Sequence, residues 1–268
     1  MLTLEWPEFA ASGLAHTEFA GRGLAMTIGV FDGVHRGHQV LVERVLASGL
    51  AAAAVCFRRS PKFILRPETD KGDIMGAEQK LRLFGQMGIA LTVMIDFSKK
   101  FSKLSGKGFI DLLTDRGNLR FLVIGGNFRC GYRHSMDAAL IKKMNLDRGI
   151  PTEVAAPVTA GGARVSSSRI RAAIASGGLV EASELLGRRV EIDFAGLSAA
   201  SGSGGVYFDL ASKNRVMPPP GRYPALLFGN SPPGMEAEIS IDSNGVFIPL
   251  NGLGLAAVRR LEFLNGSQ

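Results

Sequence analysis

Short apolar runs alternate with amphipathic stretches as far as residue 158. Apolar residues at helical spacing, such as Leu41 and Val45 after His38, are typical of helices that bury one face. The alternation of buried strands and helices predicts an α/β domain, Rossmann-like, with a parallel sheet covered on both faces. The expected strands are residues 24–30, 51–57, 91–97, 119–124 and 152–158, and the expected helices are 38–49, 76–87, 108–116 and 136–147.

The pattern of apolar and turn-forming residues changes after Arg188. Short apolar runs are then separated by Gly, Pro, Asn and Ser, which is typical of an antiparallel β-barrel or sandwich. We therefore predict an α/β domain over residues 1–187 and a small antiparallel β-barrel over 188–268. For residues 1–23 we expect an outer strand or a loop. The expected strands of the second domain are 190–194, 205–210, 223–229, 235–241, 245–250 and 259–264.

Composition narrows the class of protein. Hydrophobic residues make up 46% and charged residues 21% of the 268 residues, which is a globular rather than a disordered composition. The formal net charge of +7 favours anionic partners. The basic residues form scattered pairs such as Lys99-Lys100, without the clustered charge and stacking aromatics of a nucleic-acid surface, so we expect no nucleic-acid partner.

Neither a metal scaffold nor a membrane segment is indicated. Cys56 and Cys130 lie far apart and form no paired motif, so no zinc site or disulfide framework is expected. No apolar run approaches the ~20 residues of a membrane span. The first residues lack the basic start and apolar centre of a signal peptide, and we expect a cytoplasmic protein. The oligomeric state does not follow from the sequence.

The stretch from Met26 to His38 carries the first candidate chemistry. A buried strand is followed by a glycine-rich turn and then by a helix, whose N-terminus attracts anions. Two imidazoles, His35 and His38, flank Gly37 and can donate hydrogen bonds to phosphate oxygens. The alternative is an ordinary strand-to-helix turn. The lysine-ended pattern of a P-loop is absent.

Three further segments are candidates for the same site. Ligands of parallel sheets bind beyond the carboxyl ends of the strands. The Arg58-Arg59 loop and the loop from Gly125 to Arg133 both follow predicted strands. A helix that begins in the serines before Arg169 has hydroxyls to cap its end, and Arg171 one turn later suits a phosphate. The alternative there is a simple serine cap with a surface arginine.

These residues resemble a known family. The run Gly29-Val30-Phe31-Asp32-Gly33-Val34-His35-Arg36-Gly37-His38 is similar to the opening motif of the bacterial FAD synthetases, which are bifunctional riboflavin kinase/FMN adenylyltransferases. Val165–Arg171 is similar to their Ile-Ser-Ser-Thr-x-Ile-Arg signature, with Ser168 in place of Thr. Val123–Gly131 resembles their Val-Val-Gly-Glu-Asn/Asp-Phe-x-Phe-Gly, with Gly126 in place of Glu and Cys130 in place of the second Phe.

The resemblance implies transfer of AMP from ATP to FMN, which yields FAD and pyrophosphate. It implies that His35, His38 and Arg171 act on the phosphates, with Mg²⁺ held largely by substrate oxygens and water rather than by a protein metal cage. ATP and FMN would be the substrates. The implied nucleotide-binding residues are Gly29, Val30, Phe31, Asp32, Gly33, Asn127, Ser167 and Ser168.

Two stretches depart from the family pattern. Cys56–Pro61 stands where the family has Thr-Phe-Asp-Pro-His-Pro, so two cations replace a carboxylate and an imidazole. Arg58, Arg59 and Phe128 are the candidates for contact with the flavin. In the second domain, Pro219–Tyr223 resembles a strand entry of the riboflavin kinase module, but that module's Gly-Phe-Pro-Thr-Ala-Asn stretch is missing. We therefore expect kinase activity to be lost.

Two other functions remain compatible with the sequence. One is a related nucleotidylyltransferase that uses a different acceptor. The other is a flavin- or nucleotide-binding pseudoenzyme, which the Arg58-Arg59 and Gly126 replacements keep open.

Overall fold

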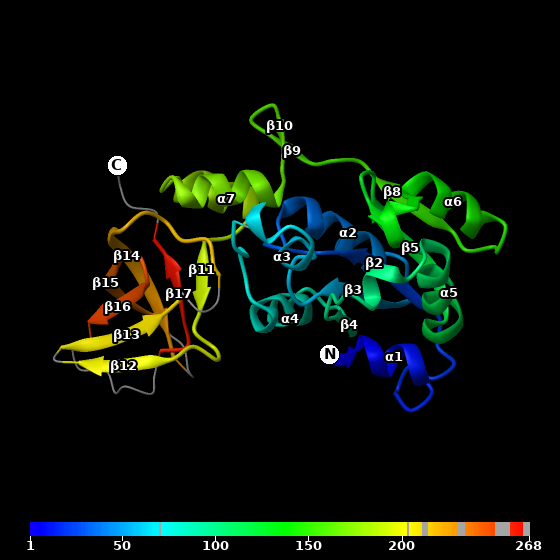
Figure 1. The fold of residues 1–268 in the computed structure, drawn as a ribbon, viewed down its shortest axis with the longest axis horizontal. Helices are drawn as coiled ribbons and strands as arrows, with labels where there is room; N and C mark the ends of the chain where they lie inside the picture. Colours follow the sequence, from blue (N-terminus) through cyan, green and yellow to red (C-terminus); the bar gives the residue numbers. More distant parts are fainter. Residues whose placement is uncertain (70, 203, 211–213, 230–233, 250–257, 265–268) are drawn as a thin grey trace. The chain divides into compact units, whose positions relative to one another are not determined.

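The computed structural model describes residues 1–69, 71–202, 204–210, 214–229, 234–249 and 258–264 (Figure 1). The chain divides into two compact units. The first contains Met1–Thr69 and Lys80–Arg164, and the second contains Asp70–Gln79 and Val165–Gln268. The predicted boundary after residue 187 stays a prediction. Each unit is described by itself.

The first unit is built on a six-stranded sheet in the order β1-β4-β3-β2-β5-β8, and every neighbouring pair is parallel. This confirms the predicted parallel sheet. Its central strands are nearly continuous apolar runs, as expected of strands buried on both faces. The strands are β1 (Leu2–Glu5), β2 (Leu24–Gly29), β3 (Ala51–Phe57), β4 (Leu91–Ile95), β5 (Leu119–Gly125) and β8 (Thr152–Ala155).

Helices cover both faces of this sheet. Leu24, Met26 and Ile28 of β2 belong to a core cluster with Phe9 of α1 and Phe109 of α5, whereas α2 contacts the sheet without joining that cluster. The helices are α1 (Trp6–Ser12), α2 (Arg36–Leu46), α3 (Lys62–Leu65), α4 (Ala77–Gln86), α5 (Gly106–Gly117) and α6 (Ala138–Leu146), with 3-10 turns η1 (Pro67–Thr69), η2 (Phe101–Lys103) and η3 (Tyr132–His134).

The first unit also contains two short antiparallel strand pairs outside the main sheet. β6 (Arg129–Cys130) pairs with β7 (Met136–Asp137), and β9 (Thr159–Ala160) pairs with β10 (Ala163–Arg164). The first pair corrects one expectation, because residues 136–137 are extended and the predicted helix begins only at Ala138. Asp137 instead caps that helix, its carboxylate accepting a hydrogen bond from the Leu140 N–H.

The second unit contains two helices, α7 (Ser167–Ala175) and α8 (Leu179–Leu186), and a seven-stranded antiparallel sheet in the order β11-β17-β14-β15-β16-β13-β12. In Figure 1 this sheet curls strongly, in line with the predicted small barrel. β12 was not predicted. The strands are β11 (Glu191–Asp193), β12 (Ala199–Gly202), β13 (Gly205–Asp209), β14 (Gly221–Phe228), β15 (Met235–Ile241), β16 (Gly245–Pro249) and β17 (Arg260–Phe263).

The ends of the predicted elements differ little from the observed ones. The N-terminal residues left open between strand and loop form the edge strand β1 and the helix α1. Leu250, the last residue of one predicted strand, lies outside the described residues. Over the described part of the chain, none of the helices combines the length and the apolar composition needed to cross a membrane.

Gly13 and Gly21 provide a test of the packing between α1 and α5. Both have positive φ, 59° and 73°, but a Cβ on Gly13 would lie 2.5 Å from the Arg116 carbonyl oxygen, whereas one on Gly21 would meet nothing within 4 Å. Gly21→Ala should lower the free energy of unfolding by about 1–2 kcal/mol, the cost of left-handed backbone. Gly13→Ala should lower it by a further ~1–3 kcal/mol, because the Arg116 backbone must move and because the ψ of −133° at Gly13 is unfavourable for alanine. Urea unfolding measures both, and equal losses would contradict this packing.

Candidate functional site

Three loops leave the sheet of the first unit at its carboxyl edge. β3, β2 and β5 are neighbours, so the loops that follow Phe57, Gly29 and Gly125 begin side by side. They are the Arg58-Arg59 loop, the turn that leads to the two histidines, and the loop that contains Asn127. In parallel α/β sheets this edge is where ligands bind.

The turn after β2 has an unusual backbone. Phe31, Gly33 and Val34 have φ angles of 53°, 87° and 37°. Positive φ is strained for a β-branched residue such as Val34 and persists only where the surroundings enforce it. Phe31 and Val34 are both fully buried, and the Val34 N–H donates to the Phe31 carbonyl at 3.2 Å. Core packing therefore holds the turn in one shape.

The two histidines form a stacked pair at the start of α2. His35 is the N-cap residue, and its ring lies 3.6 Å from that of His38 between centroids, with 16° between the planes. The His38 ring also lies 5.0 Å from the ring of Phe31. His35 is buried and His38 half-buried. The pair predicted from the sequence is thus brought together by the turn.

The N-terminus of α2 carries no capping side chain. The His35 side chain makes no cap hydrogen bond, and the first turn contains no acidic residue. The backbone is nevertheless well ordered, because the N–H groups of His38 and Gln39 both donate to the His35 carbonyl, and the Gln39 side chain donates to the carbonyl of Val34 at 3.0 Å. The first turn of α2 therefore contributes no carboxylate of its own against the positive end of the helix dipole.

Lys80 is a residue at this edge that sequence reasoning missed. Its ammonium nitrogen donates to the carbonyls of Val30, at 2.9 Å, and Phe57, at 2.6 Å, and the residue is only 2% exposed. The polar run Glu78-Gln79-Lys80 is typical of a solvent-facing helix surface. No signal in the sequence distinguished this lysine from the surface ones.

The two arginines after β3 have different surroundings. Arg58 pairs with Glu5 at 2.5 Å and with Asp96 at 3.0 Å, which joins the ends of β1, β3 and β4. Burial acts to lower the pKa of the Arg58 guanidinium, but the two carboxylates outweigh it and raise that pKa. The Arg59 guanidinium lies 3.5 Å above the ring of Phe63 on α3. Arg58 therefore ties strands together, and Arg59 sits against an aromatic ring.

Asn127 and Phe128 lie in the loop after β5. The Asn127 side-chain oxygen accepts a hydrogen bond from Arg164 at 2.7 Å, and both residues are exposed. Phe128 is half-buried against the core cluster of the first unit. Its N–H donates to the carbonyl of Gly125, which closes a tight turn directly after the strand.

The serines and the arginine of the second motif belong to the second unit. Ser166 caps α7, its hydroxyl accepting from the Arg169 N–H at 3.3 Å, so the predicted serine cap is present. Ser167 is half-buried and Ser168 exposed on the first turn. Arg171 donates through Nε to the carbonyl of Gly72 at 2.7 Å.

Among the residues described, no three His, Cys, Asp or Glu side chains group so as to hold a metal ion. Burial raises the pKa of the Cys56 thiol to about 11, although Lys80 and Arg58 act in the opposite direction. Burial also raises the pKa of the Cys130 thiol to about 12. Both thiols are therefore protonated at neutral pH.

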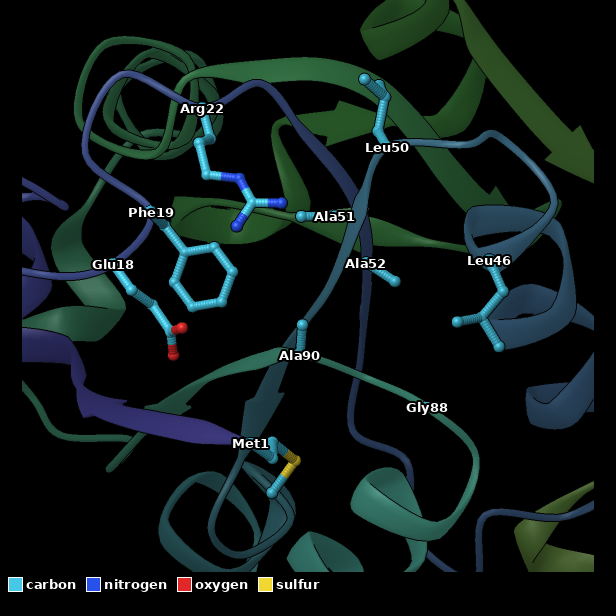
Figure 2. A pocket seen from close by; sticks show the side chains of 10 residues that line it. All are labelled: Met1, Glu18, Phe19, Arg22, Leu46, Leu50, Ala51, Ala52, Gly88 and Ala90. Carbon is cyan, nitrogen blue, oxygen red and sulfur yellow. The ribbon is translucent and has the colours of Figure 1, made fainter.

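The hollow drawn in Figure 2 lies at the other edge of the sheet. It has a volume of about 420 Å³ and is lined by Met1, Ala51 and Ala90, which stand at the beginnings of β1, β3 and β4. Arg22 lies over the ring of Phe19 on one side of it. A second hollow, of about 790 Å³, includes Pro151 before β8 and is also at the amino edge. Neither contains the stacked histidines.

Comparison with known proteins identifies relatives of this chain. It is 31% identical over 170 residues to the bifunctional riboflavin kinase/FMN adenylyltransferase of Escherichia coli strain K12, a match of 62% of this chain and 54% of that protein. It is 32% identical over 185 residues to the Pseudomonas fluorescens protein of the same name, 67% of this chain and 59% of that one. The chain thus spans little more than half the length of the curated relatives it matches.

A solved structure shares the fold. The crystal structure titled macrolide-efflux protein from Streptococcus pneumoniae matches all of both chains with a TM-score of 0.78 and 20% sequence identity. At that identity the likeness is one of fold alone. The family model described as FAD synthetase matches residues 18–169, which include the histidine turn, all three loops of the carboxyl edge and the serines of α7. Because this match covers more than half of the 268 residues, the chain belongs to the FAD synthetase family.

Proposed function

We propose that this protein transfers AMP from ATP to the phosphate of FMN, which forms FAD and releases pyrophosphate. The observation that carries the proposal is the stacked His35–His38 pair at the uncapped N-terminus of α2, within a member of the FAD synthetase family. Imidazole donors and a positive helix end suit a transferring phosphate, which gathers negative charge on its oxygens.

The reaction is a single in-line displacement. An oxygen of the FMN phosphate forms a bond to the α-phosphorus of ATP, while the bond between that phosphorus and the α–β bridging oxygen breaks. The electron pair leaves with pyrophosphate, so no covalent enzyme intermediate is needed. His35 and His38 donate to the oxygens of the α-phosphate, and because the turn already fixes their rings, little reorganisation accompanies the transfer.

Both main-chain groups and side chains hold the nucleotide. We assign to nucleotide binding the main-chain groups of Gly29, Val30, Phe31, Asp32 and Gly33, together with Asn127 in the loop after β5. Ser167, Ser168 and Arg171 hold the β- and γ-phosphates that leave. Arginine suits this role, because its planar fork can bind two phosphate oxygens at once.

On the flavin side, we assign Phe128 to the ring system and the Arg58-Arg59 loop to the FMN phosphate. The two arginines are not equivalent. Arg58 has two carboxylate partners, so its net attraction for a further anion is reduced, whereas the aromatic partner of Arg59 bears no formal charge.

Magnesium fits this site as a companion of ATP. A small hard cation keeps several waters and binds substrate phosphates readily, and the described residues offer no three-residue cage that would compete for it. When bound to the phosphates it would neutralise part of their charge. A related transferase with another acceptor, and a pseudoenzyme that binds without turnover, are the competing functions.

The direct test is mass spectrometry of the products formed from ATP, Mg²⁺ and FMN. We expect FAD and pyrophosphate in equal amounts. Parallel reactions with other phosphate acceptors distinguish a related transferase. Tight binding of ATP or FMN without pyrophosphate release would identify a pseudoenzyme and overturn the proposal.

Replacement of His38 tests the phosphate donors. His38→Ala should lower turnover by roughly 10²-fold or more, the scale of losing one preorganised transition-state donor. Its thermal stability should change little, because the ring is half-buried. His16→Ala removes an exposed histidine of the same unit and is the matched control. A His38→Ala protein with near-normal turnover would remove this residue from the mechanism.

Replacement of Arg171 tests the leaving-phosphate contacts. Arg171→Ala should weaken ATP binding by roughly 10–100-fold, the loss of a charged hydrogen-bond partner, and FMN binding much less. Arg171→Lys should restore only part of the ATP affinity, since an ammonium cannot reproduce the planar fork of a guanidinium. Arg169→Ala, in the same helix, is the control. Calorimetric titration gives the affinities for ATP and FMN. Full recovery of ATP binding in Arg171→Lys would contradict a contact that needs the guanidinium fork.

The C-terminal sheet should not phosphorylate riboflavin. Kinase chemistry needs a second ATP site, and positioning and charge stabilisation are most of what such a site supplies. The family's Gly-Phe-Pro-Thr-Ala-Asn stretch for this purpose is missing, and only Asp209–Asn214, of which residues 211–213 lie outside the described residues, occupies the region. Riboflavin, ATP and Mg²⁺ should therefore yield neither FMN nor FAD by chromatography. Steady formation of either product would contradict the loss of the kinase.

A further inference from the structure

The carboxyl ends of β2 and β3 are joined by one buried cation. The last paired residues of these strands are Gly29 and Cys56. The next residues in register are Val30 and Phe57, and their carbonyls are the two acceptors of the Lys80 ammonium. At the position where the two strands separate into loops, the side chain of Lys80 thus links their main-chain carbonyls in place of a direct backbone hydrogen bond.

The same helix also holds the histidine turn through its rings. Phe84, one turn after Lys80 in α4, meets the ring of Phe31 edge-on, with 5.2 Å between centroids. Phe31 in turn lies against His38. One side of α4 therefore fixes the backbone that enters the turn and the aromatic ring beneath the imidazole.

The burial of Lys80 rules out direct contact with a ligand. An ammonium that is 2% exposed is costly unless it is well bonded, and here two main-chain carbonyls provide that compensation. Whatever it contributes to a reaction must pass through those carbonyls to the loops beyond them. One of these loops carries His35 and His38, and the other carries Arg58 and Arg59.

We propose that Lys80 is a positioning residue for adenylyl transfer, which sets the spacing between the histidine turn and the Arg58-Arg59 loop. This inference rests on the proposed function. Donors that act on a transition state must be placed closely, and a shift of about 1 Å can cost on the order of 10² in rate. Lys80 provides that placement by clamping two loop origins that otherwise begin to diverge.

The first experiment replaces Lys80 by the isosteric but uncharged methionine in the full chain. Lys80→Met should lower kcat for FAD formation by about 10–100-fold, whereas the equilibrium Kd for ATP changes less than about threefold. Lys142→Met removes an exposed lysine from α6 of the same unit and should behave as wild type. Circular dichroism gives the folded fraction of each sample, and activity is expressed per folded molecule.

The second experiment restores the cation without the covalent link. Lys80→Ala leaves room for a small amine, and n-propylammonium should raise its kcat by at least several-fold in a saturable way. Butanol at the same concentrations should not, because it lacks the charge and the additional donors. A purely structural role would raise the folded fraction without altering kcat per folded molecule.

The outcomes separate this inference from the function it rests on. If the wild-type protein makes no FAD, the proposed function fails and this role fails with it. If the wild type makes FAD but Lys80→Met keeps its kcat, or if propylammonium leaves the kcat of folded Lys80→Ala unchanged, only the positioning role is overturned.

Discussion

A parallel sheet that is buried on both faces must still satisfy the main-chain carbonyls at the end of each strand. In this chain the requirement is strictest between β2 and β3, because both strands are buried along most of their length and their ladder stops at Gly29 and Cys56. The next two carbonyls have no ladder partner across the strands, and an unbonded carbonyl there would be costly. The ammonium of Lys80 bonds to both. The origins of the histidine turn and of the Arg58-Arg59 loop are fixed by these two hydrogen bonds.

The histidine turn depends on that fixed origin. Its positive φ angles at Phe31 and Val34 are unfavourable by themselves, and they persist because both side chains are buried. The consequence is a helix whose first residues bring two imidazoles face to face beside a positive helix end. Strain, burial and helix dipole thus combine to present hydrogen-bond donors in a geometry that exists before any ligand binds. Preorganisation of this kind is what charge stabilisation in phosphoryl chemistry requires.

The family match covers the two units unequally. The family model covers residues 18–169 and so the carboxyl ends of every strand of the first sheet except β1. The antiparallel sheet lies beyond that span, and the full-length structural likeness at 20% identity speaks for its fold alone. Arg171 also lies just outside the matched span, and its Nε bonds to the Gly72 carbonyl, in a segment that joins the second unit although it precedes α4.

The sequence by itself determined the strands of both sheets apart from β1 and β12, the helix that starts at the histidines and the serine cap of α7, because local apolar patterning and capping chemistry specify such features. It also identified the family, since the motif from Gly29 to His38 is contiguous. Only the tertiary structure decided that Lys80 is buried, that Arg58 pairs with Glu5 and Asp96, and that the small residues of β12 form a strand by pairing with β13. Each of these depends on partners distant in the chain or on burial that local polarity does not reveal. A polar residue in a sequence reports that it needs hydrogen-bond partners, and only the folded chain supplies their identity.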